Sequence, residues 1–169
     1  PSYARIDLCL SLRHALEVLE AAAAEQDTRL ETALPSCPVP IIGDSAELEE
    51  LFLNLLTNAL EAVAEQPVGS REVHITVVLQ ASGAVVQIRD SGRGIPLDVV
   101  NRLFDPFITT KPRGSGLGLA ICAGIVERHR GHLAAANANE GGAVFTTTIP
   151  LAHEVSGASI SSSSSDPSS

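Results

Sequence analysis

The chain has 169 residues, a length that suits one domain with a sizeable hydrophobic core. Hydrophobic residues make up 44% of it and aromatic residues only 3%, so leucine, isoleucine, valine and alanine must fill that core. A net charge of −9 argues against a general nucleic-acid binder, which needs a basic surface.

The first half of the chain alternates between strand and helix patterns. The spacing of aliphatic residues predicts, in chain order, a short strand at 6–8, a helix at 10–24, a strand at 28–34 and a helix from about 45 to 64. Asp44 or Ser45 can cap the second of these helices.

That second helix carries a single polar stripe. Glu47, Glu50, Asn54, Asn58 and Glu61 share one narrow face, and nearly all other positions are apolar. A helix this apolar is mostly buried, so the stripe is either a solvated edge or the lining of a cavity. The two amides point the same way, and an amide oxygen is a suitable ligand for Mg²⁺.

The second half of the chain begins with the clearest hairpin. The pattern predicts strands at 73–79 and 84–90, a short helix at 96–101, a loop at 103–114, a helix at 115–130 and a strand pair at 133–137 and 144–149. Gly131 is expected to end the last helix.

Asp90 ends an apolar strand face, and Gly92 and Gly94 follow it. A carboxylate there needs a donor, and a flat heterocycle with an exocyclic amine could supply one. The alternative is a turn aspartate that caps its own backbone.

The run GSGLGL at 114–119 is a second glycine-rich element. It matches neither the dinucleotide-binding fingerprint nor a P-loop. It does lead into a helix, whose N-terminal N–H groups suit an anion, and Lys111 and Arg113 stand just before it. A flexible hinge with solvated charges is the alternative.

Together these elements resemble the GHKL (Bergerat-fold) ATP-binding superfamily. In the right order, the chain carries runs similar to the N box (NLLTNA, 54–59), the G1 box (DSGRG, 90–94), the F box (LFDPF, 103–107), the G2 box (GSGLGL, 114–119) and a G3 motif (GGAVF, 141–145). The F box and the TTKP run at 109–112 resemble bacterial sensor histidine kinases of the nitrogen-regulatory type.

The resemblance implies an α+β fold, the Bergerat-fold α/β sandwich. A mixed sheet of about five strands would carry three main helices on one face. Residues 1–152 would form the catalytic and ATP-binding domain, and the serine-rich residues 153–169 a disordered tail.

The resemblance also implies ATP and Mg²⁺ as cofactors. Asn58 would hold Mg²⁺, Asn54 would lie beside the phosphates with Lys111, and Asp90 would accept from the adenine amine. The remaining implied nucleotide contacts are Gly92, Gly94, Ile95, Thr110, Gly114, Gly116, Leu117, Gly118 and Leu119. The segment from about 96 to 115 would be a lid over the nucleotide.

The chain departs from the family pattern in three places. Members that hydrolyse ATP carry glutamate where this chain has Asn54, which favours a kinase over a hydrolase. Ala143 stands where many members have threonine after the G3 glycine. Glu61 and Ala62 stand where many kinases have a basic residue.

None of the five histidines is followed by the acidic residue and Arg/Lys-x-Pro pattern of a phosphoacceptor. We therefore expect the catalytic domain of a larger sensor histidine kinase, acting on a histidine of a separate dimerisation domain. A response regulator would act downstream, and the isolated domain would be a monomer. The alternatives are an anti-sigma-factor-type serine kinase, a non-catalytic nucleotide-binding interaction module and a GHL-type hydrolase.

Cys9, Cys37 and Cys122 form no CxxC pair, which is typical of isolated reduced thiols in a cytoplasmic protein. No apolar run reaches the length of a membrane span, and the first residues do not resemble a signal peptide. We expect a soluble cytoplasmic domain, whose parent is either membrane-anchored or soluble.

Overall fold

The computed structural model describes residues 1–108 and 117–153. Its helices are α1 (Leu8–Glu25), α2 (Ser45–Ala64), the 3₁₀ turn η1 (Val100–Arg102) and α3 (Gly118–Arg128). Its strands are β1 (Ala4–Asp7), β2 (Arg29–Ala33), β3 (Pro40–Gly43), β4 (Glu72–Gln80), β5 (Gly83–Asp90), β6 (His132–Asn137) and β7 (Ala143–Ile149). Within these described residues, no helix has the length and apolarity needed to cross a bilayer.

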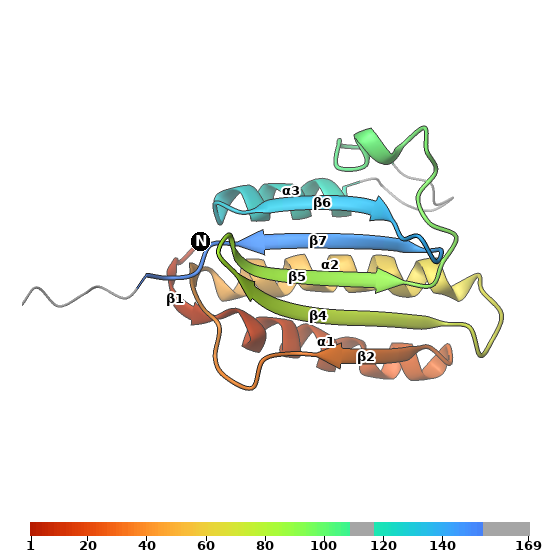
Figure 1. The fold of residues 1–169 in the computed structure, drawn as a ribbon, viewed down its shortest axis with the longest axis horizontal. Coiled ribbons are helices and arrows are strands. Elements are labelled where there is room, and N and C mark those ends of the chain that lie inside the picture. The colour runs from red at the N-terminus through yellow and green to blue at the C-terminus, as the bar shows by residue number, and fades with distance from the viewer. Residues whose placement is uncertain (109–116, 154–169) are drawn as a thin grey trace, which may run out of the picture.

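Five strands form one mixed sheet in the order β2-β4-β5-β7-β6 (Figure 1). β2 pairs with β4 in parallel, and the other neighbours pair antiparallel. Along β4, apolar side chains alternate with polar ones, so Val73, Ile75 and Val77 all point into the core. The β4–β5 hairpin places Asp90 opposite Val73, at the end of the sheet where β5 terminates.

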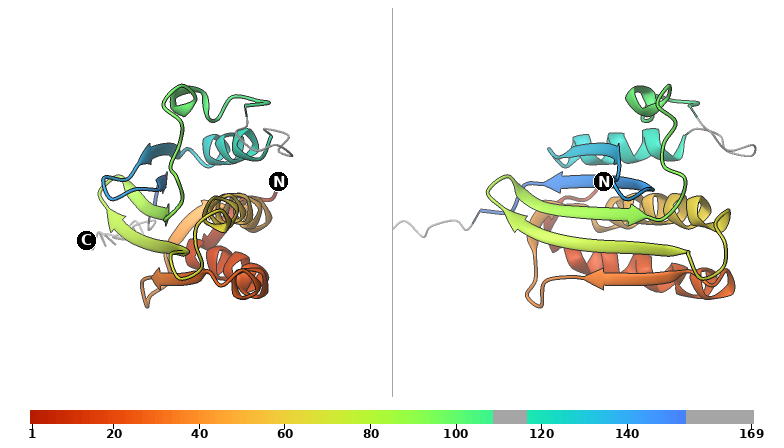
Figure 2. Two further views of the ribbon diagram at one scale, coloured as in Figure 1. Left: turned by 90° about the vertical axis from the view of Figure 1, so that its right-hand side faces the viewer. Right: turned by 45° about the vertical axis from the view of Figure 1, so that its right-hand side comes forward.

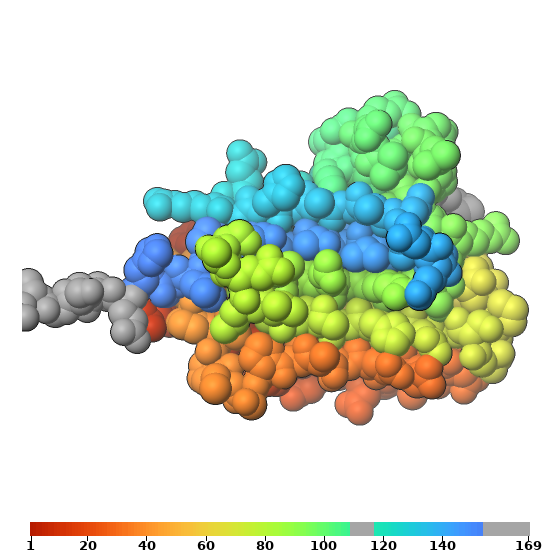
Figure 3. Space-filling model, in the orientation of Figure 1, coloured from red at the N-terminus to blue at the C-terminus, as the bar shows by residue number. Residues whose placement is uncertain are grey.

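All three α-helices lie on one face of this sheet (Figure 2, left). α2 packs against both α1 and α3 and lies over β4 and β5. Its apolar residues Leu48, Leu51, Phe52 and Leu55 are fully or almost fully buried, as the aliphatic composition requires. No helix formed by the described residues covers the opposite face of the sheet, which faces the viewer in Figure 3.

The expected α+β sandwich, with a mixed five-stranded sheet and three helices on one face, is confirmed. A small second sheet was not predicted: β1 pairs antiparallel with β3, and Ile6 lies opposite Ile41. The predicted helix at 96–101 is wrong, because only Val100–Arg102 forms a single 3₁₀ turn there.

The end of α3 also differs from the prediction. Arg130, not Gly131, takes the left-handed backbone conformation, with φ of 57°. The N–H of Gly131 donates to the carbonyl of Val126 at 2.9 Å, which closes a Schellman motif. Position 131 requires glycine for another reason, because a Cβ atom on Gly131 would lie 2.3 Å from the carbonyl oxygen of Thr148 in β7.

Candidate functional site

The turn after β5 and the first turn of α3 both lie against α2, the turn at the last turn of that helix and α3 near its middle. A Cβ atom added to Gly92 in the turn would lie 2.9 Å from the carbonyl oxygen of Ala62, so the turn lies directly against α2. A Cβ atom on Gly118, the first residue of α3, would lie 3.4 Å from Oδ1 of Asn54. Three segments singled out in the sequence are therefore brought together.

The two asparagines of α2 lie one turn apart, and both are half-buried. Nδ2 of Asn54 donates to the carbonyl oxygen of Glu50 at 3.0 Å, while its Oδ1 is the atom nearest to Gly118. Glu50 and Glu61, on the same stripe, are exposed. The stripe is thus solvated at these two glutamates and partly enclosed at the asparagines.

Asp90 is anchored from two sides and is only 2% exposed. Its Oδ1 accepts from the backbone N–H of Gly92 at 2.9 Å and from that of Ala143, the first residue of β7, at 3.3 Å. The first bond is the self-capping contact considered as the alternative role of this residue. The second comes from another strand, so the carboxylate is also fixed by tertiary structure. Gly142 lets β7 start this close, because a Cβ there would lie 1.9 Å from the carbonyl oxygen of Asp90.

Asn137, the last residue of β6, holds the other end of the same turn. Its Oδ1 accepts from the N–H of Ile95 at 2.6 Å, and its Nδ2 donates to the carbonyl oxygen of Ile95 at 2.9 Å. Gly94 has φ of 83°, and a Cβ there would lie 2.6 Å from Oδ1 of Asn137, so both the backbone and the space require glycine. The sequence analysis did not identify Asn137 as a site residue. The one signal that the sequence offers is its position shortly before the G3-like run at 141–145.

The second glycine element enters the site through α3. Leu117, the N-cap residue of this helix, makes no side-chain capping hydrogen bond, and the first N–H groups of a helix suit an anion. Gly118 and Leu119 are partly buried there, and Leu117 just before them is exposed. The other predicted contacts of this segment lie outside the described residues: Thr110, Lys111, Gly114 and Gly116.

The two phenylalanines of the F-box-like run have different environments. The ring of Phe104 packs edge-on against Phe145 of β7, with ring centroids 6.3 Å apart. Phe107 is 74% exposed and has φ of 69°, an unfavourable backbone conformation for a bulky side chain. The first ring therefore attaches this segment to the core, while the second is presented to the exterior.

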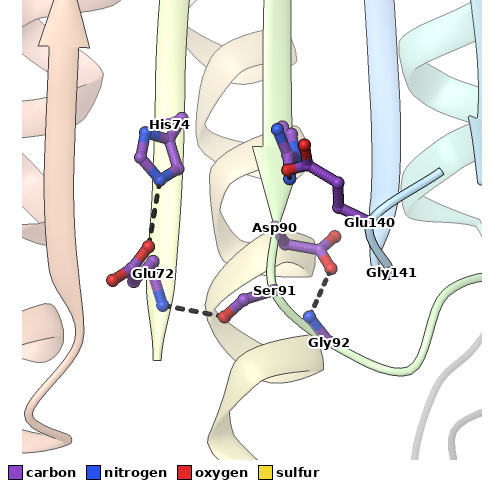
Figure 4. A pocket seen from close by; sticks show the side chains of 8 residues that line it. Glu72, His74, Asp90, Ser91, Gly92, Glu140 and Gly141 are labelled. Carbon is purple, nitrogen blue, oxygen red and sulfur yellow. Dashed lines mark hydrogen bonds and ion pairs between the residues drawn. The ribbon is translucent and has the colours of Figure 1, made fainter. Parts of the chain in front are cut away.

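A polar pocket of about 190 Å³ lies on the opposite side of Asp90 from the helices (Figure 4). Its charged groups are paired with one another: Nε2 of His74 lies 3.2 Å from Oε2 of Glu72, and Arg89 donates to Glu140 at 2.7 Å. The hydrogen bond and charge of Arg89 hold the pKa of Glu140 below its usual range. The pocket shares Asp90 and Gly92 with the candidate site, but neither asparagine of α2 lines it.

The residues present fit a magnesium ion held together with a phosphate ligand. The described residues contain no group of three or more histidine, cysteine and acidic side chains that could form a metal cage. Mg²⁺ in phosphate-transferring sites needs no such cage, because it keeps several waters and takes one or two protein oxygens besides the phosphates. The half-buried amide of Asn58 on α2 can supply such an oxygen.

A helix-covered mixed sheet, with an asparagine helix, an anchored aspartate and a glycine-led helix at one end, defines a nucleotide-binding α/β sandwich. The family profile for histidine kinase-, DNA gyrase B- and HSP90-like ATPases matches residues 43–153. The chain belongs to this family, which is the GHKL superfamily that the sequence motifs resemble.

Its relatives are sensor kinases. The chain is 34% identical over 154 residues to the C4-dicarboxylate transport sensor protein DctS of Rhodobacter capsulatus, covering 91% of this chain and 23% of that protein. It is 31% identical over 146 residues to the sensor histidine kinase ZraS of Escherichia coli K12, covering 86% and 30%. The chain thus spans about a quarter to a third of the length of these two relatives.

Solved structures share the fold. The catalytic domain of the histidine kinase ThkA superposes with a TM-score of 0.79 at 27% identity, covering 89% of this chain and 96% of that one. The histidine kinase ShkA, solved with AMPPNP, gives a TM-score of 0.77 at 27% identity, covering 90% and 32%. The chain therefore has the fold of a histidine kinase ATP-binding domain.

Proposed function

We propose that this chain is the ATP-binding catalytic domain of a two-component sensor histidine kinase. It transfers the γ-phosphoryl group of ATP to a histidine on a dimerisation domain outside this chain. The arrangement of two segments along α2 supports the proposal: the turn at 90–95 lies against Ala62, and Gly118 lies against Asn54. The sensor-kinase relatives support it and favour it over a serine kinase or a non-catalytic module.

The adenine end of the site is the turn after β5. The anchored carboxylate of Asp90 accepts a hydrogen bond from the exocyclic amine of adenine. Gly92 and Gly94 let the turn beside the ring lie close against α2 and Asn137. Ile95, which is 8% exposed, adds an apolar wall. A charged acceptor fixed before the ligand arrives favours adenine over a base that presents a carbonyl at that position.

The phosphate end lies between α2 and α3. Asn58 provides an amide oxygen to Mg²⁺, which neutralises phosphate charge when it is bound. Asn54 lies beside the phosphates, and the backbone amides of Gly118 and Leu119 donate to them. The other proposed contacts are Thr110, Lys111, Gly114, Gly116 and Leu117.

The chemistry needs positioning more than proton transfer. The bond from the γ-phosphorus to the β,γ-bridging oxygen breaks, a bond from phosphorus to an imidazole nitrogen forms, and ADP leaves. Hydrolysis would need a base to activate water, and the amide of Asn54 cannot accept a proton from water. The site therefore favours transfer to histidine over release of phosphate.

The outer face of α3 is the proposed contact with the dimerisation domain. Leu117 and Ile121 are 38% and 42% exposed, and with Ala120, Gly124 and Arg128 they line a groove of about 350 Å³. This face begins directly at the phosphate-binding turn, so a helix seated on it would bring its histidine to the γ-phosphate. The isolated domain is proposed to be a cytoplasmic monomer, with a response regulator acting after the dimerisation domain.

The test combines binding with transfer. Titration calorimetry of the isolated domain with ATP and Mg²⁺ should give binding at millimolar affinity or tighter. Labelled ATP with a supplied sensor-kinase dimerisation domain should then label that domain through an acid-labile phosphohistidine. An acid-stable label would indicate a serine kinase, and rapid ATP turnover without a partner would indicate a hydrolase. Absence of binding would reject the proposal altogether.

A further inference from the structure

We infer that Asn137 is a positioning residue for the adenine side of the site, an inference that rests on the proposed function. It fixes the backbone of Ile95, and through Ile95 it sets the shape of the turn that begins at Asp90. Asn137 lies at the end of β6, forty-two residues away in sequence from the residue it holds.

The contact has two hydrogen bonds on one residue. Oδ1 accepts from the N–H of Ile95 at 2.6 Å, and Nδ2 donates to the carbonyl oxygen of the same residue at 2.9 Å. A carboxamide is suited to this task because it offers an acceptor and a donor side by side. The two bonds fix both the position and the orientation of the backbone at Ile95.

The same strand pair also holds the other end of the turn. Asn137 lies directly opposite Ala143 in the β6–β7 ladder. Ala143 donates its N–H to Oδ1 of Asp90, while Asn137 holds Ile95. One cross-strand pair thus holds both ends of the turn. The backbone N–H of Ala143 binds the side chain of Asp90 at the start of the turn, and the side chain of Asn137 binds the backbone of Ile95 at its end.

This arrangement has a consequence for ligand binding. The turn contains Gly92 and Gly94, and glycine-rich backbone has many conformations to lose when it is ordered. Holding both ends to the sheet before the ligand arrives removes much of that cost from binding. Losing the Asn137 contacts should therefore weaken nucleotide binding, although Asn137 itself is not expected to touch the nucleotide.

The test uses Asn137→Ala and Asn137→Asp, with Asn139→Asp as the matched control. Asn139 is exposed in the β6–β7 turn two residues later, so its replacement adds the same charge without touching the contact to Ile95. Dissociation constants for ATP and ADP, each with Mg²⁺, are measured from about pH 8 to about pH 4, near the ordinary pKa of aspartate, and divided by the wild-type value at the same pH. Circular dichroism melting without nucleotide shows that each variant is folded at the temperature of the titration.

At the upper end of that range, both Asn137 variants should bind ATP roughly tenfold more weakly than the wild type, and ADP by the same factor. Equal factors are expected because the turn contacts the part of the ligand that ATP and ADP share. As pH falls, the Asn137→Asp ratio should move back toward one, because a protonated carboxyl again offers a donor and an acceptor to Ile95. Asn137→Ala should show no such recovery, and Asn139→Asp should match the wild type throughout.

Wild-type affinity in both Asn137 variants would overturn the inference and leave the proposed function standing. A pH-independent ratio for Asn137→Asp would also overturn it, because the two-bond contact would then not be what binding depends on. Failure of the wild type itself to bind would reject the proposed function instead.

Discussion

Arg128, in the last turn of α3, donates from Nε to Oε1 of Glu47, in the first turn of α2, at 2.8 Å. The hydroxyl of Tyr3 donates to the other carboxylate oxygen of Glu47 at 3.0 Å. Burial raises the pKa of Glu47, but the hydrogen bonds from Arg128 and Tyr3 outweigh that effect and hold it below its usual range. These contacts join the start of α2 to the end of α3 that lies farthest from Gly118.

The first prediction concerns this ion pair. Glu47→Gln should lower the free energy of unfolding by about 1 kcal/mol, a modest figure because Arg128 is half-exposed. A carboxyl with a lowered pKa in the folded state stabilises above its unfolded pKa, and that contribution is lost as pH falls through the folded pKa. Urea unfolding should therefore show the largest difference from wild type near neutral pH, and a smaller one below about pH 4.

Glu20→Gln on the exposed face of α1 is the control for this prediction, and it should change stability little at any pH. If the difference between Glu47→Gln and wild type were constant with pH, the ionised pair would not be its source.

The second prediction concerns Asp90. Asp90→Asn should keep the backbone contacts to Gly92 and Ala143 through its amide oxygen. Its amide NH2 group, however, is a donor and replaces the acceptor oxygen proposed to bind the adenine amine. ATP affinity should fall by roughly 10- to 100-fold, the size expected for a hydrogen bond to a charged group, while the melting temperature without nucleotide changes little. Asp27→Asn, at an exposed position in the turn after α1, should bind ATP like the wild type, as titration calorimetry would show. Equal affinity in Asp90→Asn and wild type would remove the adenine role of Asp90.

The third prediction uses two glycines of α3. Alanine at either position should raise the melting temperature, since alanine favours helix over glycine by about 1 kcal/mol. At Gly118 the new methyl group would lie 3.4 Å from Oδ1 of Asn54, so Gly118→Ala should also weaken ATP binding. At Gly124 it would meet only the flexible end of Arg128, so Gly124→Ala should bind ATP normally. Equal ATP affinities in the two variants would show that the first turn of α3 lies outside the nucleotide site.

The fourth prediction concerns thiol reactivity. Burial raises the pKa of the Cys122 thiol to about 12 and also raises the pKa of Cys9, so neither forms much thiolate near neutral pH. Cys37 is exposed. A disulfide reagent such as DTNB should therefore react rapidly with one thiol of the native protein and with all three after denaturation. Rapid reaction of two or three native thiols would contradict the burial of Cys9 and Cys122.

Much of the fold could be predicted because its signals are local. The alternation of Val73, Ile75 and Val77 indicates a half-buried strand, and the side chain of Asp44 caps α2 by accepting from the N–H of Glu47 at 3.0 Å. β3 had no such signal, because it follows Pro35 and Pro38, begins at Pro40 and becomes a strand only by pairing with β1. The helix expected at 96–101 failed because its short pattern is compatible with a 3₁₀ turn as well.

By itself, the sequence determined the order of the nucleotide-binding motifs, the asparagine stripe on α2 and the two glycines that follow Asp90. The motifs were recognised by their resemblance to a known superfamily, and the stripe and the glycines follow from residue types at fixed spacing along the chain. Only the tertiary structure decided that Asn137 and Ala143 bracket the turn from β6 and β7, and that Arg128 binds Glu47. Those contacts join residues more than forty positions apart. The packing of the helices on the sheet sets them, and no local propensity records that packing.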